Sequence, residues 1–429
     1  MENPYRQYMY SYPHKTAYGR LQDVHLKDYL SRLTGRENSL YLHIPFCQYK
    51  CGYCNLFSVA GQSERWMRDY VDAMQRQAEQ ISTALPKGVK FTDLTLGGGT
   101  PLILPPSLLR RVFSMARDSF GFESEGHSVV VETSPNQTTE EKLAILKEEG
   151  VKRISIGVQS FHEEELAALH RFHKVESVRR ALRSIRKMEF ECMNIDLIYG
   201  IPGQTMDSLK DSLQQALEYE PEELFVYPLY VKPGTFLYQQ GLKRSGDTFL
   251  MYQCVRDILR DAGYQPHSMR RFVKSSQKLP ESLCGFGDTI SIGCGGRSYI
   301  DELHFCTVYA VKQEDCLTIL KEYLETEDFL KITNGFILSQ EEQKRRYVIK
   351  HILFGRGINQ QDYQRHFGRT VLQDFPLIKE WEQEGYVTAG EEYITLTEDG
   401  FALSDDLGPQ LISSEVSKRT EEFYEKWMI

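Results

Sequence analysis

The sequence has 429 residues, of which 41% are hydrophobic and 26% are charged, so it can bury a large core and form two or three domains. No stretch approaches the ~20 consecutive apolar residues of a membrane helix, and residues 1–18 carry tyrosines where a signal peptide has an apolar run. The formal net charge of −9 opposes binding to a phosphate backbone, so we expect a cytoplasmic protein that binds neither membranes nor nucleic acids.

Residues 1–38 precede the first strong strand pattern. They include the triplet Ser11-Tyr12-Pro13, followed by His14 and Lys15. We expect this segment to be an N-terminal extension that folds over the substrate mouth. A surface strand or a frayed tail is the alternative.

From residue 39 onward, β-rich runs alternate with segments of helical period. The runs that predict strands are 39–44, 93–97, 129–132, 153–157, 194–198 and 223–229. The segments that predict helices are 64–83, 105–119, 138–149, 175–188 and 206–218. This alternation is typical of parallel strands joined by crossover helices. Because a closed barrel has eight strands in ~250 residues, we predict an α/β fold with an open, partial (β/α)6 barrel over 39–230 and its active site at the carboxyl ends of the strands.

The remaining chain divides into two parts. Residues 231–338 have weaker periodicity and several glycines, and we predict an extension that closes the barrel mouth. Residues 339–429 predict helices at 340–354, 359–367 and 371–385 and a hairpin at 386–387 and 393–396, an order that suggests a C-terminal winged-helix-like domain. The acidic side chains in its third helix oppose contact with DNA, so a packing or substrate-covering role is expected.

Three of the nine cysteines, Cys47, Cys51 and Cys54, lie within eight residues directly after the first predicted strand. The cytosol keeps thiols reduced, so a metal site explains this grouping better than disulfides do. Thiolate ligands select zinc or iron–sulfur clusters. Zinc would need a fourth ligand, for which the candidates are His43, Cys284, Cys294, Cys306 and Cys316. The position of the cysteines at the start of a βα array favours a cluster.

The cysteine spacing resembles the signature of the radical S-adenosylmethionine (SAM) superfamily. The resemblance implies a [4Fe-4S] cluster on Cys47, Cys51 and Cys54, with one open iron that binds the amino and carboxylate groups of SAM. It also implies that an electron from the cluster breaks SAM into methionine and a 5′-deoxyadenosyl radical. Tyr53 matches an aromatic residue that packs near the adenine, although a role in loop packing is equally compatible with the sequence.

The predicted strand 93–97 runs into the sequence Gly-Gly-Gly-Thr-Pro at 97–101. Glycines in such a turn let the backbone approach a ligand closely, although a plain turn is the default interpretation. The segment resembles the part of the superfamily that hydrogen-bonds the methionyl group of SAM. This resemblance implies that Gly98, Gly99 and Thr100 contact the cofactor.

A closer resemblance is to the oxygen-independent coproporphyrinogen III dehydrogenase family, whose relatives include heme chaperones and class C radical SAM methyltransferases. The matching segments are 41–54, 97–101, 150–161, 194–205 and 394–400. The resemblance implies that Glu132 and Asp196 accept hydrogen bonds from SAM and that Arg171 pairs with its carboxylate. Ordinary ion pairs are the alternative for all three side chains.

This family is also distinguished by a second SAM molecule in the active site. Tyr41, Gly99, Thr100 and Gln159 match positions near that second molecule. The resemblance therefore implies one or two SAM molecules beside the cluster, although Tyr41 could equally be an ordinary side chain of the barrel.

Two departures from the family bear on the reaction. The decarboxylating enzymes carry a further cysteine where this chain has Leu56, and heme chaperones usually have a histidine where this chain has Arg297 and Ser298. We therefore predict a radical SAM enzyme that performs methylation or methylene transfer, with coproporphyrinogen-type oxidation or heme chaperoning as the alternatives. The expected partners are a small-molecule or peptide substrate and an electron donor such as flavodoxin or ferredoxin.

Overall fold

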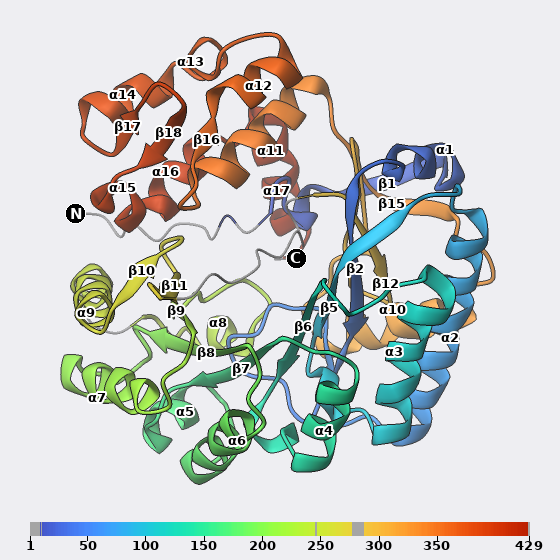
Figure 1. The fold of residues 1–429 in the computed structure, drawn as a ribbon, viewed down its shortest axis with the longest axis horizontal. Helices are drawn as coiled ribbons and strands as arrows, with labels where there is room; N and C mark the ends of the chain where they lie inside the picture. Colours follow the sequence, from blue (N-terminus) through green and yellow to red (C-terminus); the bar gives the residue numbers. More distant parts are fainter. Residues whose placement is uncertain (1–8, 10, 245–246, 277–286, 428–429) are drawn as a thin grey trace.

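The computed structural model describes residues 9, 11–244, 247–276 and 287–427. All six predicted parallel strands are present: β2 (Glu37–Ile44), β5 (Lys90–Gly98), β6 (Ser128–Thr133), β7 (Arg153–Gln159), β8 (Cys192–Tyr199) and β9 (Glu223–Pro228). They are connected through α2 (Glu64–Ala84), α3 (Pro106–Phe120), α4 (Glu140–Glu148), α5 (Glu163–Ala168), α6 (Val175–Lys187) and α7 (Met206–Leu217). Figure 1 shows these helices around the outside of the strands. The strands are almost wholly buried, as expected for a parallel sheet covered by helices, and the predicted α/β fold is confirmed.

The sheet extends well beyond these six strands. Its order in the described residues is β1-β15-β14-β13-β12-β2-β5-β6-β7-β8-β9-β11-β10. The added strands are β1 (Gly19–His25), β10 (Tyr264–Pro266), β11 (Arg271–Lys274), β12 (Thr289–Ile292), β13 (Ser298–Ile300), β14 (Leu303–Phe305) and β15 (Lys331–Ile337). Of these, β12 pairs parallel to β2 and the others pair antiparallel. Because β1 and β10 end the order without pairing to each other, the barrel is open.

The N-terminal extension is an ordered part of this architecture. Its strand β1 forms the edge of the sheet against β15, and short helical turns follow at α1 (Lys27–Leu30) and η2 (Ser31–Leu33). Upstream of β1, the Tyr12 ring is 1% exposed and its hydroxyl donates to Glu342. The described part of the extension is therefore neither a frayed tail nor a strand on the surface alone.

The segment after β9 contributes the helices α8 (Phe236–Gln239), α9 (Thr248–Asp261) and α10 (Gln313–Glu325) in addition to its short strands. Each of these strands has only three or four residues, except β15. Such short runs produce little periodicity, which explains why this part of the sheet was not predicted. The segment lengthens the sheet at both ends and does not simply cap its mouth.

The C-terminal elements are α11 (Gln340–Ile352), β16 (Ile358–Asn359), α12 (Gln360–Phe367), α13 (Val371–Asp374), α14 (Leu377–Gln383), β17 (Val387–Ala389), β18 (Tyr393–Leu396), α15 (Glu398–Ala402), α16 (Ser404–Gln410) and α17 (Ser414–Trp427). In Figure 1 they form the orange and red layer at the top of the view. The helix predicted over 371–385 is split in two, because Pro376 lacks an N–H and disfavours the α conformation of Phe375.

These elements share a hydrophobic cluster of their own, which includes Ile349, Ile378 and Trp381 and also takes in Tyr12 from the N-terminal segment. The division of the chain at 38, 230 and 338 and the winged-helix-like interpretation stay predictions. None of the helices in the described part of the chain is both long and apolar enough to cross a membrane.

Candidate active site

Cys47 ends the short strand β3 (Phe46–Cys47), and Cys51 and Cys54 lie on the loop that connects it to its partner strand β4 (Val59–Ala60). Two neighbouring segments fix this loop through the backbone of Gly52. The Gly52 N–H donates to the Leu169 carbonyl over 2.9 Å, and the Gly52 carbonyl accepts from the Leu237 N–H over 2.9 Å. The loop is therefore held in place by the segment after α5 and by α8.

Cys47, Cys51 and Cys54 are half-buried and line the same cavity. The Arg171 guanidinium lies 3.2 Å from the Cys51 sulfur, and the Thr100 hydroxyl lies 3.8 Å from the Cys47 sulfur. Burial, reinforced by the neighbouring Cys54 and Cys51, raises the pKa of the Cys47 thiol to about 12. Three thiolates can be held together here when positive metal charge compensates them, because a coordinating thiol is deprotonated outright. The donor set therefore fits a metal centre.

The sequence leaves two alternatives for this metal centre, a zinc ion and an iron–sulfur cluster. Among the described residues, no three His, Cys, Asp or Glu side chains converge closely enough to hold a single metal ion. A [4Fe-4S] cluster has no such requirement, because each of its thiolates binds a different iron. The proposed fourth zinc ligand His43 instead lies 3.2 Å from the Phe57 carbonyl, and Cys284 lies outside the described residues. The arrangement favours an iron–sulfur cluster.

The glycine turn after β5 packs directly against the cysteine loop. The Gly99 N–H donates to the Ile44 carbonyl and the Thr100 N–H to the Phe46 carbonyl, each over 2.8 Å. A Cβ atom at Gly99 would lie 2.6 Å from the Phe46 carbonyl oxygen, and Gly98 has a φ of 114°. Glycine is therefore required here by close contact with the cysteine loop, in addition to any contact with a ligand.

One cavity of about 360 Å³ joins these parts. This volume lies within the range of about 300–1,000 Å³ that is usual for small-molecule sites. Of the residues predicted to bind the cofactor, Tyr41 alone does not line this cavity. The residues that do line it are Tyr53, Gly98, Gly99, Thr100, Glu132, Gln159, Arg171 and Asp196. The Tyr41 hydroxyl lies 3.4 Å from the His43 ring, below the glycine turn, so its contact with a second SAM stays a prediction.

Glu132 and Asp196 form an acidic wall of the cavity. Glu132 accepts a hydrogen bond from the Gly98 N–H over 3.1 Å, and Asp196 accepts one from the Asn194 amide over 2.7 Å. Burial, with a further contribution from the charge of Glu132, raises the pKa of Asp196 to about 7. In the described part of the chain, neither carboxylate forms an ion pair with a Lys or Arg side chain. The predicted hydrogen bonds from SAM to these two carboxylates stay a prediction.

Gln159 and Arg171 complete the cavity on its other side. Gln159 has a φ of 76° at an irregularity in the pairing of β7 with β8, a backbone conformation that L residues adopt only rarely. The Arg171 guanidinium donates to the Tyr53 hydroxyl over 3.1 Å and to the Gly157 carbonyl. Arg171 thus already ties β7 to the cysteine loop, and its predicted pairing with the carboxylate of SAM stays a prediction.

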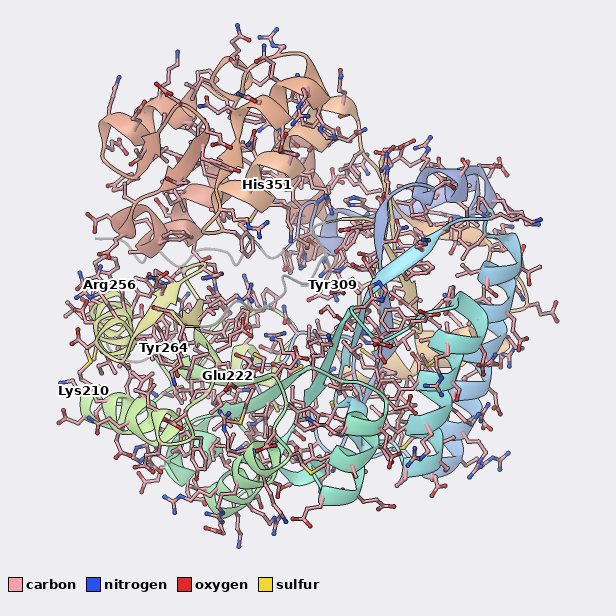
Figure 2. The ribbon with its side chains drawn as sticks, in the orientation of Figure 1. Lys210, Glu222, Arg256, Tyr264, Tyr309 and His351 are labelled. Atoms are coloured by element: carbon pink, nitrogen blue, oxygen red, sulfur yellow. The ribbon has the colours of Figure 1, made fainter. Side chains whose placement is uncertain are left out.

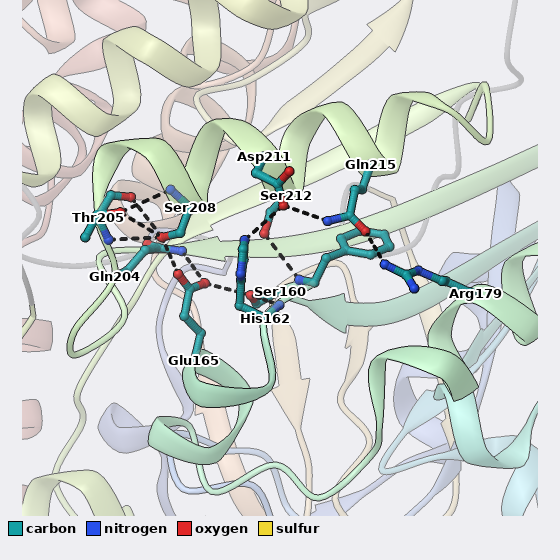
Figure 3. Close-up of polar contacts among 11 residues, drawn as sticks. Ser160, His162, Glu165, Arg179, Gln204, Thr205, Ser208, Asp211, Ser212 and Gln215 are labelled. Carbon is teal, nitrogen blue, oxygen red and sulfur yellow. Dashed lines mark hydrogen bonds and ion pairs between the residues drawn. The ribbon is translucent and has the colours of Figure 1, made fainter.

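Figure 3 shows a second polar cluster, formed by Glu165 of α5, Ser208 of α7, and Ser160 and Gln204. The Glu165 carboxylate accepts hydrogen bonds from Ser160 over 2.6 Å, from Gln204 over 2.9 Å and from Ser208 over 2.5 Å. Gln204 in turn accepts from the Gly200 N–H over 2.7 Å. The segment 200–205, which carries part of the family resemblance, therefore supports the site and does not line its cavity.

Sequence analysis missed several residues that shape the site, namely Ser155, Asn194, Glu165 and Tyr230. Asn194 and Asp196 stand two apart on β8 and so share one face of the strand, a signal that the sequence does contain. Ser155, whose hydroxyl lies 3.4 Å from the Asp196 carboxylate, is on the neighbouring strand. That contact depends on the register between β7 and β8, which the sequence does not reveal.

Comparison with known proteins identifies the family to which this chain belongs. A family model described as the radical SAM superfamily matches residues 41–216, a range that includes all three clustered cysteines. The chain is 30% identical over 266 residues to the heme chaperone HemW of Escherichia coli (strain K12), covering 61% of this chain and 70% of that protein. It is 27% identical over 425 residues to the oxygen-independent coproporphyrinogen III oxidase of the same organism, covering 92% and 91%.

A third relative is the heme chaperone HemW of Bacillus subtilis (strain 168), which is 28% identical over 383 residues and is covered over 97% of its length. The fold matches the solved structure of coproporphyrinogen III oxidase (HemN) from Escherichia coli with a TM-score of 0.81 and 24% identity, covering 94% of this chain and 96% of that one. The cofactors that accompany this membership are a [4Fe-4S] cluster and SAM. The chain belongs to the HemN-like family of radical SAM enzymes.

Proposed function

We propose that this chain holds a [4Fe-4S] cluster on Cys47, Cys51 and Cys54 and cleaves SAM there to a 5′-deoxyadenosyl radical, which removes a hydrogen atom to start the reaction. The observation that carries the proposal is that the three cysteines, the glycine turn and the acidic wall line one cavity. These parts come from the carboxyl ends of successive parallel strands, which is where α/β folds bind their ligands.

When bound and reduced, the cluster supplies the electron that splits SAM into methionine and a 5′-deoxyadenosyl radical. Beside the hydrogen bonds that they already accept, Glu132 and Asp196 have carboxylate oxygens that can accept from the hydroxyl or ammonium groups of SAM, and such charge-assisted hydrogen bonds are the strong ones. Arg171 fixes the positions of Cys51 and Tyr53. The backbone N–H groups of the glycine turn already donate to Glu132, to Ile44 at the end of β2 and to Phe46 of β3. They therefore hold the acidic wall close to the start of the cysteine loop.

The test is anaerobic reconstitution with iron and sulfide, followed by reduction with dithionite in the presence of SAM. We expect about four irons per chain, as for a cubane cluster, and the formation of 5′-deoxyadenosine measured by liquid chromatography. A protein that binds four irons and SAM but forms no 5′-deoxyadenosine would contradict the proposal.

For the reaction that follows, we propose methylene or methyl transfer that uses a second SAM molecule. Leu56, which stands where the decarboxylating relatives carry a cysteine, lines the cavity together with Gly99, Thr100 and Gln159. The relatives named above are heme chaperones and oxidases, and no methyltransferase is among them. The proposal therefore depends on these residues of the cavity and on the resemblance described under sequence analysis.

Methyl-deuterated SAM separates this reaction from oxidative chemistry. Methylene transfer removes a hydrogen from the methyl group of the second SAM, so deuterium is expected in 5′-deoxyadenosine, together with S-adenosylhomocysteine. The readout is the mass of the 5′-deoxyadenosine. Unlabelled 5′-deoxyadenosine without any homocysteine product would overturn methyl transfer and favour hydrogen abstraction from the substrate, as in oxidation.

Heme chaperoning is the second candidate, because two of the relatives named above are heme chaperones. The contacts of two side chains argue against a heme-binding role. Arg297 donates to the Ser11 hydroxyl, and the Ser298 hydroxyl accepts from the Ser291 N–H over 2.9 Å, so neither residue offers a heme ligand. Titration of the reconstituted chain with heme is expected to give no stoichiometric Soret shift, and tight one-to-one binding would favour the chaperone instead.

A further inference from the structure

Two phenylalanine side chains beside the cysteine loop are exposed to solvent. Phe172, in the segment after α5, is 58% exposed, and Phe236 of α8 is 40% exposed. The half-buried His170 joins them, because its ring centre lies 4.8 Å from that of Phe172 and 4.2 Å from that of Phe236. The Tyr49 ring of the cysteine loop lies 5.4 Å from the Phe172 ring. These four rings form one aromatic patch.

The aromatic patch lies on the side of the cysteine loop that faces away from the cavity. All of residues 47–56 line the cavity except Gly52, whose backbone instead bonds to the segment after α5 and to α8. A Cβ atom at Gly52 would lie 2.9 Å from the His170 Cβ atom, so the patch packs directly on the loop. Neither Phe172 nor Phe236 lines the cavity. A ligand inside the cavity therefore does not explain why these two rings are exposed.

The segments that build the aromatic patch are rich in positive charge. Residues 47–57, 169–174 and 236–244 together contain five Lys or Arg residues and not one Asp or Glu. The whole chain, in contrast, has a formal net charge of −9. Lys174 and Lys243 are the fully exposed cations of these segments. The patch therefore combines exposed aromatic surface with positive charge.

The carboxylates that flank these segments offset this charge only in part. Glu163, Glu165 and Asp247 accept hydrogen bonds within the protein, and Glu176 pairs with an arginine of its own helix, α6. Glu164 of α5 is exposed. A partner that contacts the patch therefore meets more positive than negative charge.

We propose that the aromatic patch is the docking surface for an acidic one-electron carrier protein, of the flavodoxin or ferredoxin type, that reduces the cluster. The carrier loses one electron and the cluster gains it, and no bond forms between the two proteins. Exposed aromatic rings are typical of protein interfaces, and redox partners use small ones. The position of the patch against the cysteine loop favours a redox partner, and its positive charge favours an acidic one. This inference rests on the proposed function and adds the place where the electron donor binds.

The test measures the binding of oxidised flavodoxin and of oxidised ferredoxin to the full-length, cluster-reconstituted chain by biolayer interferometry. We expect at least one carrier to bind, with an affinity that falls as the ionic strength rises, because salt screens the charges of the two surfaces. The carrier that binds more tightly identifies the type of donor. Absence of binding by both carriers, or binding that does not respond to salt, would overturn the proposal.

Variants assign the binding to the patch. Phe172→Ala is expected to weaken carrier binding about tenfold, as truncation of an aromatic anchor does at an interface. Lys174→Glu is expected to weaken it about fivefold, because reversing a charge at the rim slows association. The matched controls are Tyr393→Ala, at a 40% exposed ring of β18, and Lys210→Glu on α7, which Figure 2 shows at the outer edge of the barrel. Both controls should bind like the wild type, and unchanged affinity in both test variants would overturn the proposal.

A comparison of two reductants separates this surface from the site itself. Dithionite is a small reductant that needs no docking surface, so Phe172→Ala should form 5′-deoxyadenosine at the wild-type rate with dithionite. With a subsaturating reduced carrier, the same variant should be about tenfold slower. Equal slowing with both reductants would overturn the proposal. Carrier binding by a wild type that forms no 5′-deoxyadenosine with either reductant contradicts the proposed function and leaves the docking surface standing.

A second copy of this chain is the alternative occupant of an exposed aromatic patch. Light scattering of the reconstituted wild type distinguishes it, and we expect a monomer. A dimer that Phe172→Ala converts into a monomer would overturn the proposal.

Discussion

Two buried polar clusters of this chain differ in the partners of their carboxylates. The Glu165 cluster places one carboxylate among three donors, Ser160, Gln204 and Ser208. The acidic wall places two carboxylates in one cavity, where Glu132 accepts from the Gly98 N–H and Asp196 from the Asn194 amide, and neither forms an ion pair with a Lys or Arg of the described residues. Glu165 and Ser208 belong to the helices α5 and α7, whereas Glu132 and Asp196 belong to the strands β6 and β8.

This difference suggests a structural role for the Glu165 cluster and a ligand-binding role for the acidic wall. Glu165 is 5% exposed and meets three side-chain donors, whereas burial raises the pKa of both Glu132 and Asp196. A satisfied cluster stabilises the fold, and an unsatisfied one lowers stability unless a ligand completes it. Removing a charge from each cluster is therefore expected to have opposite consequences for stability and for SAM binding.

The largest effect is expected when a cluster ligand is removed. Cys51→Ala should abolish the [4Fe-4S] cluster and reduce the formation of 5′-deoxyadenosine to background, because the cavity then offers only two thiolates. Iron analysis and the visible absorption of the reconstituted protein measure the loss. Cys254→Ala, on α9 and outside the cavity, is the control and should retain four irons. Normal iron content in the Cys51 variant would mean that the cluster lies elsewhere.

The next largest effect is expected at the satisfied cluster. Glu165→Ala should lower the free energy of unfolding by about 1–3 kcal/mol for each buried partner left without a hydrogen bond. Urea unfolding measures the change, and SAM binding by the folded variant should stay within a few-fold of the wild type. Glu164→Ala, exposed on the same helix, should change stability by about 0.5 kcal/mol or less. A stable Glu165 variant that no longer binds SAM would reverse the roles assigned to the two clusters.

Asp196→Asn should show the opposite pattern, with weaker SAM binding and no loss of stability. Losing one hydrogen bond from a charged acceptor costs about 1.5–3 kcal/mol, which is about tenfold or more in affinity. Equilibrium dialysis with SAM measures it, and Asp207→Asn at an exposed position of α7 is the control. Wild-type affinity in the Asp196 variant would show that the acidic wall is merely structural.

The raised pKa of Asp196 also gives this prediction a pH dependence. Because the pKa rises from 3.8 to about 7 in the folded protein, the proton-bound form is favoured below pH 7. SAM affinity should therefore increase from pH 6 to pH 8 as the carboxylate ionises. Stability should change in the opposite direction, because a raised acid pKa removes stability as the pH rises from about 4 through 7. Asp196→Asn should flatten both dependences.

The smallest effect is expected for Tyr53→Phe, which removes the hydroxyl that accepts from Arg171 and retains the aromatic ring. A single neutral hydrogen bond contributes about 0.5–1.5 kcal/mol, so SAM affinity should fall by about two- to tenfold. Tyr53→Ala should weaken binding further if the ring itself contacts the cofactor. Equal affinities of the Phe and Ala variants would exclude a role for the ring.

The sequence predicted those parts of the fold that repeat over long runs. The strands β2 and β5 to β9 were recognisable because each has six or more residues of apolar character. The strands β10 to β14 have three or four residues, too few for a period-2 pattern, so their place in the sheet could not be predicted. The break between α13 and α14 follows from Pro376, which the sequence does contain.

The candidate site was predictable where one short segment carries the chemistry, as with Cys47, Cys51 and Cys54. It was not predictable where distant segments meet. The contact of Ser155 with Asp196 depends on strand register, and the hydrogen bond between Gly52 and Leu169 joins two segments that are distant in the sequence. Tyr41 shows the converse, since a matching position in the sequence does not line the cavity.

The most direct test of the central claim is an anaerobic crystal structure of the reconstituted chain with SAM. The account predicts a [4Fe-4S] cluster bound by Cys47, Cys51 and Cys54, with SAM in the same cavity between the glycine turn and the acidic wall of Glu132 and Asp196. A metal centre on other cysteines, or SAM bound outside this cavity, would contradict it.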